Sequence, residues 1–406
     1  MRSAKSPDAR LARRPALAVW ALLAVLNLTA GLVVATRPER QTDLETVRRW
    51  GHEWLVDGRS PYEIDGEAPD YPPYAIAFLS PLALLPGRLA PLAWALVNLC
   101  LAPIAAYLAV CSVRPLGKVP SAVLPVLMFL CWGGFRTLLQ FSLLSTTLGL
   151  AAMRTRGRGS LAGGLALGVA LAKPQVAAPF FLWALFARRA VTAAVALITL
   201  VAGSAAFCLR AGANPIDLVR RYVRILETFY TADPIMVGLS ELRPLIALAT
   251  SNASSVDTAA MAIGVVLLGL ICALGVKEGA KGSRVAFSAP ALAAVWSLLT
   301  FYHLTYGFII LLPAAALLLP APGAPFRQLR AWTFWFLQTA LMIDVPGAWR
   351  RFGPVFGRHS TLDAAMSHVD RFVVLALGVS IAILAWLTVM TRQRTTGSPA
   401  AADAAQ

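Results

Sequence analysis

The chain has 406 residues, of which 58% are hydrophobic and 14% are charged, and its formal net charge is +16. Its mean hydropathy of +0.67 and its many apolar runs exclude a soluble globular protein and a soluble domain held by a single anchor. The positive charge does not indicate nucleic-acid binding, because the basic residues gather in short segments between apolar runs, as they do in membrane proteins. We therefore predict an all-α polytopic membrane protein.

Twelve apolar runs divide the chain. They lie near residues 15–36, 88–113, 119–138, 141–153, 160–172, 176–188, 190–209, 256–276, 284–300, 303–320, 328–345 and 369–390. The first follows five basic residues, as a signal peptide does, but it is long enough to span and lacks a small-x-small cleavage site, so we interpret it as a membrane helix. The fourth, fifth and sixth runs are shorter than the ~20 residues of a full crossing. Such helices are expected to be buried by protein or to line a cavity.

The basic residues predict the orientation. With the N-terminus inside, the inner connections carry 19 of the 36 Lys and Arg residues and three of the 20 acidic residues, as the positive-inside rule requires. Twelve spans then place both termini in the cytoplasm and the three long polar segments, 37–87, 210–255 and 346–368, outside. We expect an inner (plasma) membrane protein with one domain over residues 1–394 and a disordered cytoplasmic tail over 395–406.

The first outer segment, 37–87, is expected to carry the chemistry. Asp43 begins a run in which apolar residues recur at spacings of three and four, as in a helix lying flat on the membrane. It lies nearest the membrane, where its surroundings can make a carboxylate an effective base, and Glu45 is a candidate for substrate binding. The alternative for either acid is a solvated loop charge.

The same segment ends on Tyr71-Pro72-Pro73-Tyr74, which opens an apolar run too short to cross a bilayer. Two prolines without amide hydrogens suit the first turn of a helix or a sharp re-entrant turn. We include Tyr71 among the substrate-binding candidates. An ordinary stiff turn is the alternative.

Further candidates come from the outer ends of later runs. Lys173 lies at the tip between two short apolar runs, where a lysine is costly unless it is paired or meets an anion such as a lipid phosphate; snorkelling to the interface is the alternative. Arg136 and Gln140 occupy the preceding outer turn, and His303 lies at the outer end of a later run. A carboxylate base with cationic contacts is what transfer from a phosphate-linked donor requires.

Several kinds of site are missing from the sequence. It contains no Walker loop, zinc-ligand spacing, Gly-rich nucleotide turn or nucleophile elbow. A nucleotide-sugar donor would be cytosolic, and the predicted cytosolic side has only short basic loops. We therefore expect a donor that arrives through the lipid.

Five segments together resemble a known family. They are Asp43 in the loop opening, Gly58-Arg59-Ser60-Pro61-Tyr62, Tyr71-Pro72-Pro73, Leu171-Ala172-Lys173-Pro174-Gln175 and Tyr302-His303. They are similar to the motifs of family 87 glycosyltransferases of the GT-C superfamily, which are polyprenol-phosphate-mannose-dependent mannosyltransferases. The chain departs from the usual Gly-Gln-x-Asn at Leu139-Gln140-Phe141-Ser142, and the usual Pro-x-x-Trp is reduced to Thr300-Phe301-Tyr302. Both departures fall near the expected substrate surfaces, so they affect which sugar and which acceptor the chain would use.

The resemblance implies a GT-C-like bundle of about 12 transmembrane helices with outward-facing loops and juxtamembrane helices. It also implies an inverting transfer of mannose from polyprenyl phosphate to a glycolipid or polysaccharide acceptor. Asp43 would deprotonate the acceptor hydroxyl, and Lys173 and His303 would position the donor. No metal or other cofactor is implied, and the partners are membrane lipid, the polyprenyl-phosphate-linked donor and the acceptor, with no nucleic acid.

Two alternatives stay open. One is a solute transporter or lipid flippase, and the other is a GT-C transferase with another sugar, such as arabinose, or with a protein acceptor. A transporter should carry ionisable residues near the middle of its spans. The core runs here are nearly free of charge, which favours an enzyme.

Overall fold

The structure, a computed structural model, describes residues 42–63, 69–87, 89–113, 140–155, 159–231, 253–280, 288–301, 305–319, 327–343 and 372–381, with a few single residues elsewhere. Its α-helices are α3 (Thr42–Leu55), α4 (Pro73–Leu79), α5 (Ala90–Val113), α8 (Ser142–Arg154), α9 (Ser160–Ala170), α10 (Pro174–Phe186), α11 (Ala190–Ala211), α12 (Pro215–Thr231), α14 (Ala253–Ala280), α15 (Ser288–Thr300), α16 (Leu312–Leu318) and α17 (Arg327–Ile343). Short 3-10 helices are η2 (Pro61–Glu63), η3 (Ser80–Leu84) and η6 (Thr305–Leu311), and Phe372–Ile381 is a further short apolar helix. Within these ranges there is no strand, which confirms the predicted all-α class.

Most of the predicted apolar runs are helices with nearly the predicted bounds. Three described helices are long and apolar enough to cross a membrane: α5 over Ala90–Ser112, α11 over Ala190–Ala211 and α14 over Ser254–Leu274. The predicted run 303–320 divides into η6 and α16. Apart from single positions, the runs 15–36 and 119–138 lie outside the described residues, so the count of twelve spans stays a prediction.

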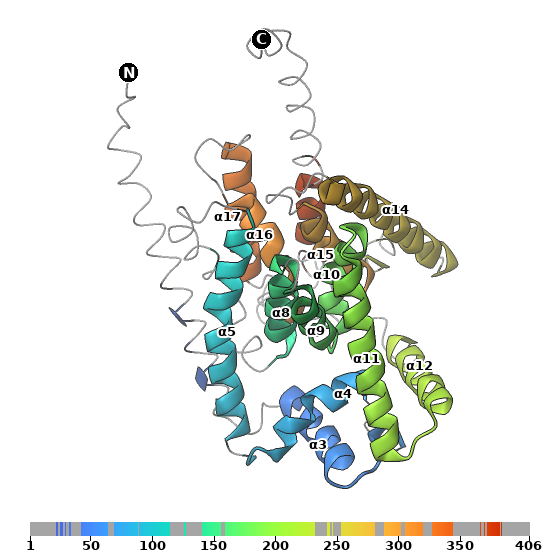
Figure 1. Ribbon diagram of the computed structural model, residues 1–406. Coiled ribbons are helices and arrows are strands. Elements are labelled where there is room, and N and C mark those ends of the chain that lie inside the picture. The colour runs from blue at the N-terminus through green and yellow to red at the C-terminus, as the bar shows by residue number, and fades with distance from the viewer. Residues whose placement is uncertain are drawn as a thin grey trace, which may run out of the picture.

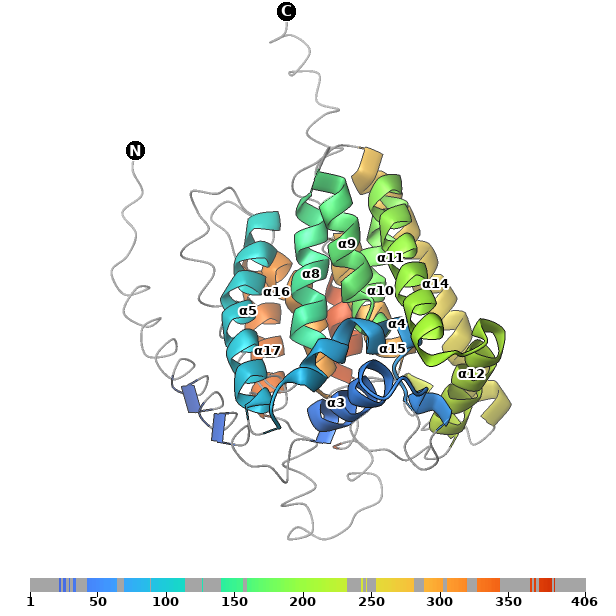
Figure 2. The same cartoon turned by 60° about the horizontal axis from the view of Figure 1, so that its bottom comes forward.

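The short helices form the centre of the bundle. α8 packs against α5, α9 and α10, while α10 also packs against α15 (Figure 2). Nine of the 13 residues of α8 are buried. Other helices therefore surround it, as its length requires if it is to lie at membrane depth.

Glycine lets α9 lie close against α11. A Cβ atom built on Gly164 would lie 2.5 Å from the Cβ of Val195, and one built on Gly168 would lie 2.5 Å from the Cβ of Thr199. No real side chain tolerates such a distance, so the two backbones approach this closely only with small residues at the contact.

Replacing Gly168 with alanine is expected to destabilise the protein by about 1–3 kcal/mol, because α9 and α11 must move apart to admit the new methyl group. Gly269→Ala on α14 is the matched control, since its Cβ would meet no atom within 4 Å and alanine favours a helix by up to about 1 kcal/mol. Thermal unfolding of the purified protein in detergent measures both. Equal midpoints for the two variants would contradict the close packing of α9 on α11.

α3 and α4 form a layer across one end of the bundle (Figures 1 and 2). α3 begins close to Asp43, as predicted, and its apolar face is buried: Leu44, Val47, Trp50 and Trp54 are each less than a tenth exposed. This face packs against α4, η3 and α11, and the Trp54 ring stacks on Phe207 at 5.6 Å. The sequence predicts that this face meets the membrane. In the structure it is covered by protein instead, because α4 and η3 pack against it.

Two prolines start α4, as the sequence predicts. Pro72 is the extended N-cap residue and Pro73 lies in the first turn, where a missing amide hydrogen leaves no helical bond unmade. Pro81 lies in the first turn of η3. Leu85, directly after η3, has extended backbone. The short apolar run is therefore a bent pair of helices that stays at one end of the bundle.

A buried arginine ties α3 to η3. The guanidinium of Arg48, which is 9% exposed, donates to the carbonyl oxygens of Leu82 and Leu85 at 3.2 and 2.6 Å. It also pairs with the carboxylate of Glu45 at 2.6 Å. This contact fixes the N-terminal half of α3 over the turn that leads into α5.

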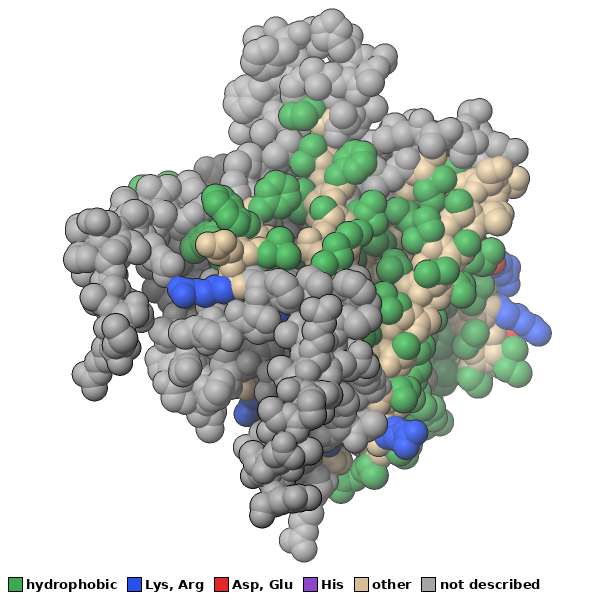
Figure 3. All heavy atoms as spheres, turned by 90° about the horizontal axis from the view of Figure 1, so that it is seen from above, with side chains coloured by type: hydrophobic (Ala, Val, Ile, Leu, Met, Phe, Trp, Pro, Cys, Tyr) green, Lys and Arg blue, Asp and Glu red, His purple; other side chains and the backbone are tan. Residues whose placement is uncertain are grey.

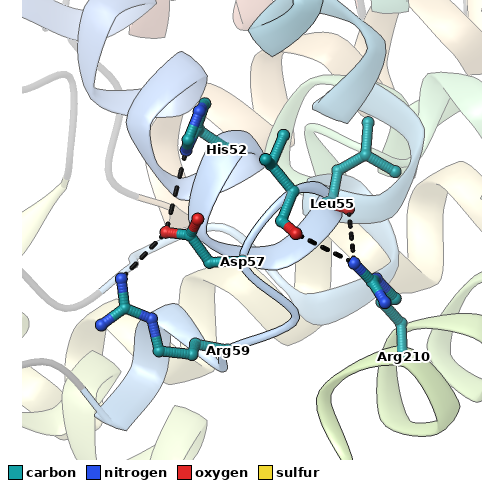
Figure 4. Close-up of polar contacts among 6 residues, drawn as sticks. His52, Leu55, Asp57, Arg59 and Arg210 are labelled. Carbon is teal, nitrogen blue, oxygen red and sulfur yellow. Dashed lines mark hydrogen bonds and ion pairs between the residues drawn. The ribbon is translucent and has the colours of Figure 1, made fainter.

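A second arginine holds the other end of α3 (Figure 4). Arg210, in the last turn of α11, donates to the carbonyl oxygens of Leu55 and Val56 at 2.9 and 3.0 Å, which are among the acceptors that a helix end leaves open. The chain then turns at Gly58, whose φ of +69° favours glycine. The glycine of the family-like segment Gly58-Arg59-Ser60-Pro61-Tyr62 thus ends α3.

The other end of the bundle is basic. Arg154 ends α8, and Arg188 and Arg189 lie between α10 and α11. Arg189 donates to the carbonyl oxygen of Thr155 at 3.5 Å and lies 5.8 Å over the ring of Trp183. Figure 3, viewed from the end away from α3, shows green apolar side chains over much of the described surface and blue ones at a few separate places.

Candidate active site

Three residues that are far apart in the sequence form a hydrogen-bonded chain beneath α3. The side-chain amide of Gln140 donates through Nε2 to Oδ2 of Asp43. The Nζ of Lys173 donates to the amide oxygen of the same Gln140 at 3.1 Å. Asp43 comes from the first turn of α3, Gln140 precedes α8, and Lys173 lies between α9 and α10. Each of the three is a predicted site residue, and the structure brings them together.

Lys173 is a buried cation. It is 3% exposed, and its position is fixed by the turn, since its amide bonds the carbonyl of Ala170 at 3.2 Å and its carbonyl accepts from Val176 at 3.0 Å. Burial lowers the pKa of its ammonium group from 10.5 to about 8, although the nearby carboxylates of Asp43 and Asp70 oppose that shift. The group therefore carries its charge at neutral pH in a site with little water.

Asp70 is a second carboxylate in the site, which the sequence analysis did not select. The residue is exposed to solvent, yet the protein around its carboxyl raises the pKa by desolvation, while Lys173 lowers it and Asp43 raises it further. Asp70 therefore interacts electrostatically with both Lys173 and Asp43. Its place directly before Tyr71-Pro72-Pro73 is the signal that could have identified it.

Aromatic rings form one wall of the site. The Tyr71 ring meets Phe141 edge-on at 6.2 Å and Trp50 at 6.1 Å. Phe141 follows Gln140 directly, and its ring lies 4.8 Å from that of Trp94 on α5. The hydroxyl of Tyr62 donates to the carbonyl of Tyr71. Tyr71 is thus held beside Gln140 through Phe141, and its role in substrate binding stays a prediction.

Glu45 does not join this group. Its carboxylate pairs with Arg48, and two residues along a helix place it about 200° around α3 from Asp43. Arg136 and His303, the other two predicted site residues, lie outside the described residues. The Ser297 hydroxyl on α15 donates to the carbonyl of Gln175, two residues after Lys173, so α15 contacts the segment that carries Lys173.

A comparison with known families identifies the chain. The model of glycosyltransferase family 87 matches residues 70–301, which is more than half of the chain. The protein belongs to glycosyltransferase family 87. No curated protein and no solved structure matched it.

This family makes the protein a membrane glycosyltransferase, in agreement with its apolar helices. The matched range contains Asp70, Gln140 and Lys173, so the site described above lies largely inside it. Asp43 lies 27 residues before the range and His303 two residues after it. The place of Asp43 in the site therefore depends on its contact with Gln140 and not on the match.

The site of the glycosyltransferase contains both cationic and anionic groups. In the described part of the chain, no group of three or more His, Cys, Asp or Glu side chains is arranged to hold a metal ion. Asp43 and Asp70 are the two nearby carboxylates, and Lys173 interacts electrostatically with both.

Proposed function

We propose that the protein is an inverting transferase that moves a sugar, mannose, from a polyprenyl-phosphate donor to a glycolipid or polysaccharide acceptor. This proposal rests on the two side-chain hydrogen bonds that link Asp43 to Gln140 and Gln140 to Lys173. They combine a carboxylate that can take a proton with a buried cation that can meet a phosphate, at the end of a bundle of apolar helices.

The orientation that we propose is supported by the arginines. Arg154, Arg188 and Arg189 lie at the end of the bundle away from the site, and short basic connections face the cytoplasm. The site then opens at the extracytoplasmic face of the inner membrane. A lipid-linked donor is suited to that face, because nucleotide sugars are made in the cytoplasm.

The proposed reaction is a single displacement. Asp43 takes the proton of the acceptor hydroxyl, and the oxygen attacks the anomeric carbon from the face opposite the phosphate. The bond between that carbon and the phosphate oxygen breaks, and its electron pair leaves with polyprenyl phosphate. Lys173 stabilises the charge that develops on the leaving phosphate. Inversion follows because one displacement occurs.

Gln140 positions Asp43 and Lys173 relative to each other. Its amide oxygen is occupied by Lys173, so its NH2 group faces Asp43. An NH2 group can only donate, so Gln140 presents a hydrogen-bond donor to the carboxylate that we propose as the base. We propose that Tyr71 forms the wall against which a sugar packs, that His303 and Arg136 assist in positioning the donor, and that no metal cofactor is required.

The function is tested by incubating the purified protein with radiolabelled polyprenyl-phosphate mannose and a membrane lipid extract. Label in a new glycolipid supports the proposal, and the product identifies the acceptor. Transfer from the corresponding arabinose donor, but not from the mannose donor, would retain the reaction class and overturn the sugar. Retention of all label in the donor with every sugar tested would contradict the proposal.

Replacing Gln140 is expected to slow transfer without changing substrate affinity. Gln140→Leu removes both hydrogen bonds, and bonds to charged groups contribute about 1.5–3 kcal/mol, so kcat should fall by roughly 10- to 100-fold. Gln140→Glu keeps the acceptor for Lys173 but loses the donor for Asp43. A fall with both variants assigns the effect to the Asp43 bond, whereas a fall with Gln140→Leu alone assigns it to the Lys173 bond. Unchanged kcat in both would contradict a positioning role.

A further inference from the structure

α12 is an amphipathic helix beside the α3 end of α11 (Figures 1 and 2). The side chain of Asn214 caps its first turn, accepting from the amides of Ile216 and Asp217 at 2.9 and 3.4 Å. Leu218 on one side is 4% exposed and packs into the apolar cluster of α3, α4 and α11. One face of α12 is therefore bound to the protein.

A second apolar strip of α12 is exposed. Ile216, Val219 and Val223 share a strip because they recur at spacings of three and four, and they are 62%, 59% and 45% exposed. The last turn of α11 exposes Leu209 to 84%. Exposed apolar surface beside a helix that can span a membrane indicates contact with lipid.

Arginines border this strip. Arg220 and Arg224 are both exposed, and Arg220 makes only a loose pair with Asp217, at 3.4 Å and with both side chains more than 60% exposed. A helix that carries apolar residues on one side and arginines on the next has the composition of helices that lie in the headgroup layer of anionic membranes.

We propose that α12 docks on the anionic lipid surface of the leaflet that faces the site. Ile216, Val219 and Val223 enter the boundary between headgroups and acyl chains, and the arginines bind lipid phosphates. That this is the outer leaflet rests on the proposed orientation of the enzyme. The proposal concerns lipid headgroups and not a protein partner, because the apolar strip adjoins α11, a helix that can itself span the membrane.

α12 also contacts the turn that carries the candidate site residues Asp70 and Tyr71. The hydroxyl of Tyr222 donates to the carbonyl of Asp70 at 3.3 Å, and the Tyr222 ring meets that of Tyr62 edge-on at 6.2 Å. Tyr62 in turn holds the carbonyl of Tyr71. The helix that contacts the lipid thus supports the turn that carries Asp70 and Tyr71.

The test uses the full chain with its five cysteines replaced by alanine. A fluorophore is attached through Val219→Cys or, as a matched control two residues away on the opposite side of α12, through Arg221→Cys. The protein is placed in nanodiscs of phosphatidylcholine alone or mixed with phosphatidylglycerol. A lipid nitroxide near the headgroup should quench the probe at position 219, and aqueous iodide should quench the probe at position 221.

Charge is tested in the same nanodiscs. Phosphatidylglycerol should increase the lipid quenching at position 219, and Arg220→Gln with Arg224→Gln should remove that increase, since each arginine changes the ratio of docked to undocked helix by about fivefold. Iodide quenching at both positions would overturn the proposal, because α12 would then lie in water. Protection of position 219 from both quenchers would also overturn it, because protein would then cover the strip. Neither readout depends on sugar transfer, so failure of the proposed function would not alter them.

Discussion

Replacement of Asp43 with asparagine is expected to reduce sugar transfer by about 100- to 10,000-fold, the usual contribution of a general base. The change removes the group that accepts the proton of the acceptor hydroxyl. It leaves the local structure intact, because the asparagine oxygen can still accept the bond that the Gln140 amide donates to Oδ2. The loss should fall on kcat, measured with labelled polyprenyl-phosphate mannose, and binding of the donor should be retained.

Asp57→Asn is the control for this experiment. Asp57 follows the same helix, but its carboxylate is held by Arg59 at 2.9 Å in the loop beyond α3 (Figure 4). Its replacement should leave transfer within about twofold of the unmodified protein, since exposed ion pairs contribute little. If Asp43→Asn retains full activity while Asp57→Asn does so too, Asp43 is not the base. Asp70 would then be the carboxylate to test next.

Most of the helices were predicted because each depends on a local pattern, whereas α12 lies in a segment that was predicted only as a polar outer loop. The apolar length of α11 and the prolines that start α4 need no knowledge of the rest of the chain. The covering of α3 was not predicted. Spacing shows that Leu44, Val47 and Trp50 share a face, but it cannot show whether lipid or the returning chain of α4 and η3 meets that face.

The site was predicted in part for a similar reason. Topology placed Asp43, Gln140 and Lys173 at one end of the bundle, since each lies beside the outer end of an apolar run. The hydrogen bonds between them depend on how α3 and the turn before α8 pack, which no local pattern contains. Glu45 was also a predicted site residue, but two residues along a helix point apart, and its carboxylate pairs with Arg48 instead.

Replacement of Lys173 with methionine is expected to reduce transfer by roughly 100- to 1,000-fold, as the loss of one preorganised electrostatic contact does in other enzymes. Methionine has nearly the same length and suits a site that is 3% exposed, so the packing around the turn should survive. Lys173→Arg keeps the charge and should retain more activity than Lys173→Met. Equal activity of the two variants would show that the charge is not what the reaction uses.

The pH dependence of transfer gives a second, independent reading of Lys173. Because burial lowers its pKa from 10.5 to about 8, transfer should decline as the pH rises through about 8, and Lys173→Arg should remove that decline, since arginine stays protonated. Loss of stability through the titration of Lys173 cannot explain the decline in transfer. Between pH 8 and 10.5 the unfolded chain binds the proton that the folded lysine has lost, so the contribution of Lys173 to stability rises with pH while activity falls. If the decline in transfer is accompanied by a lower unfolding temperature and is also seen with Lys173→Arg, another group causes the loss of activity at alkaline pH.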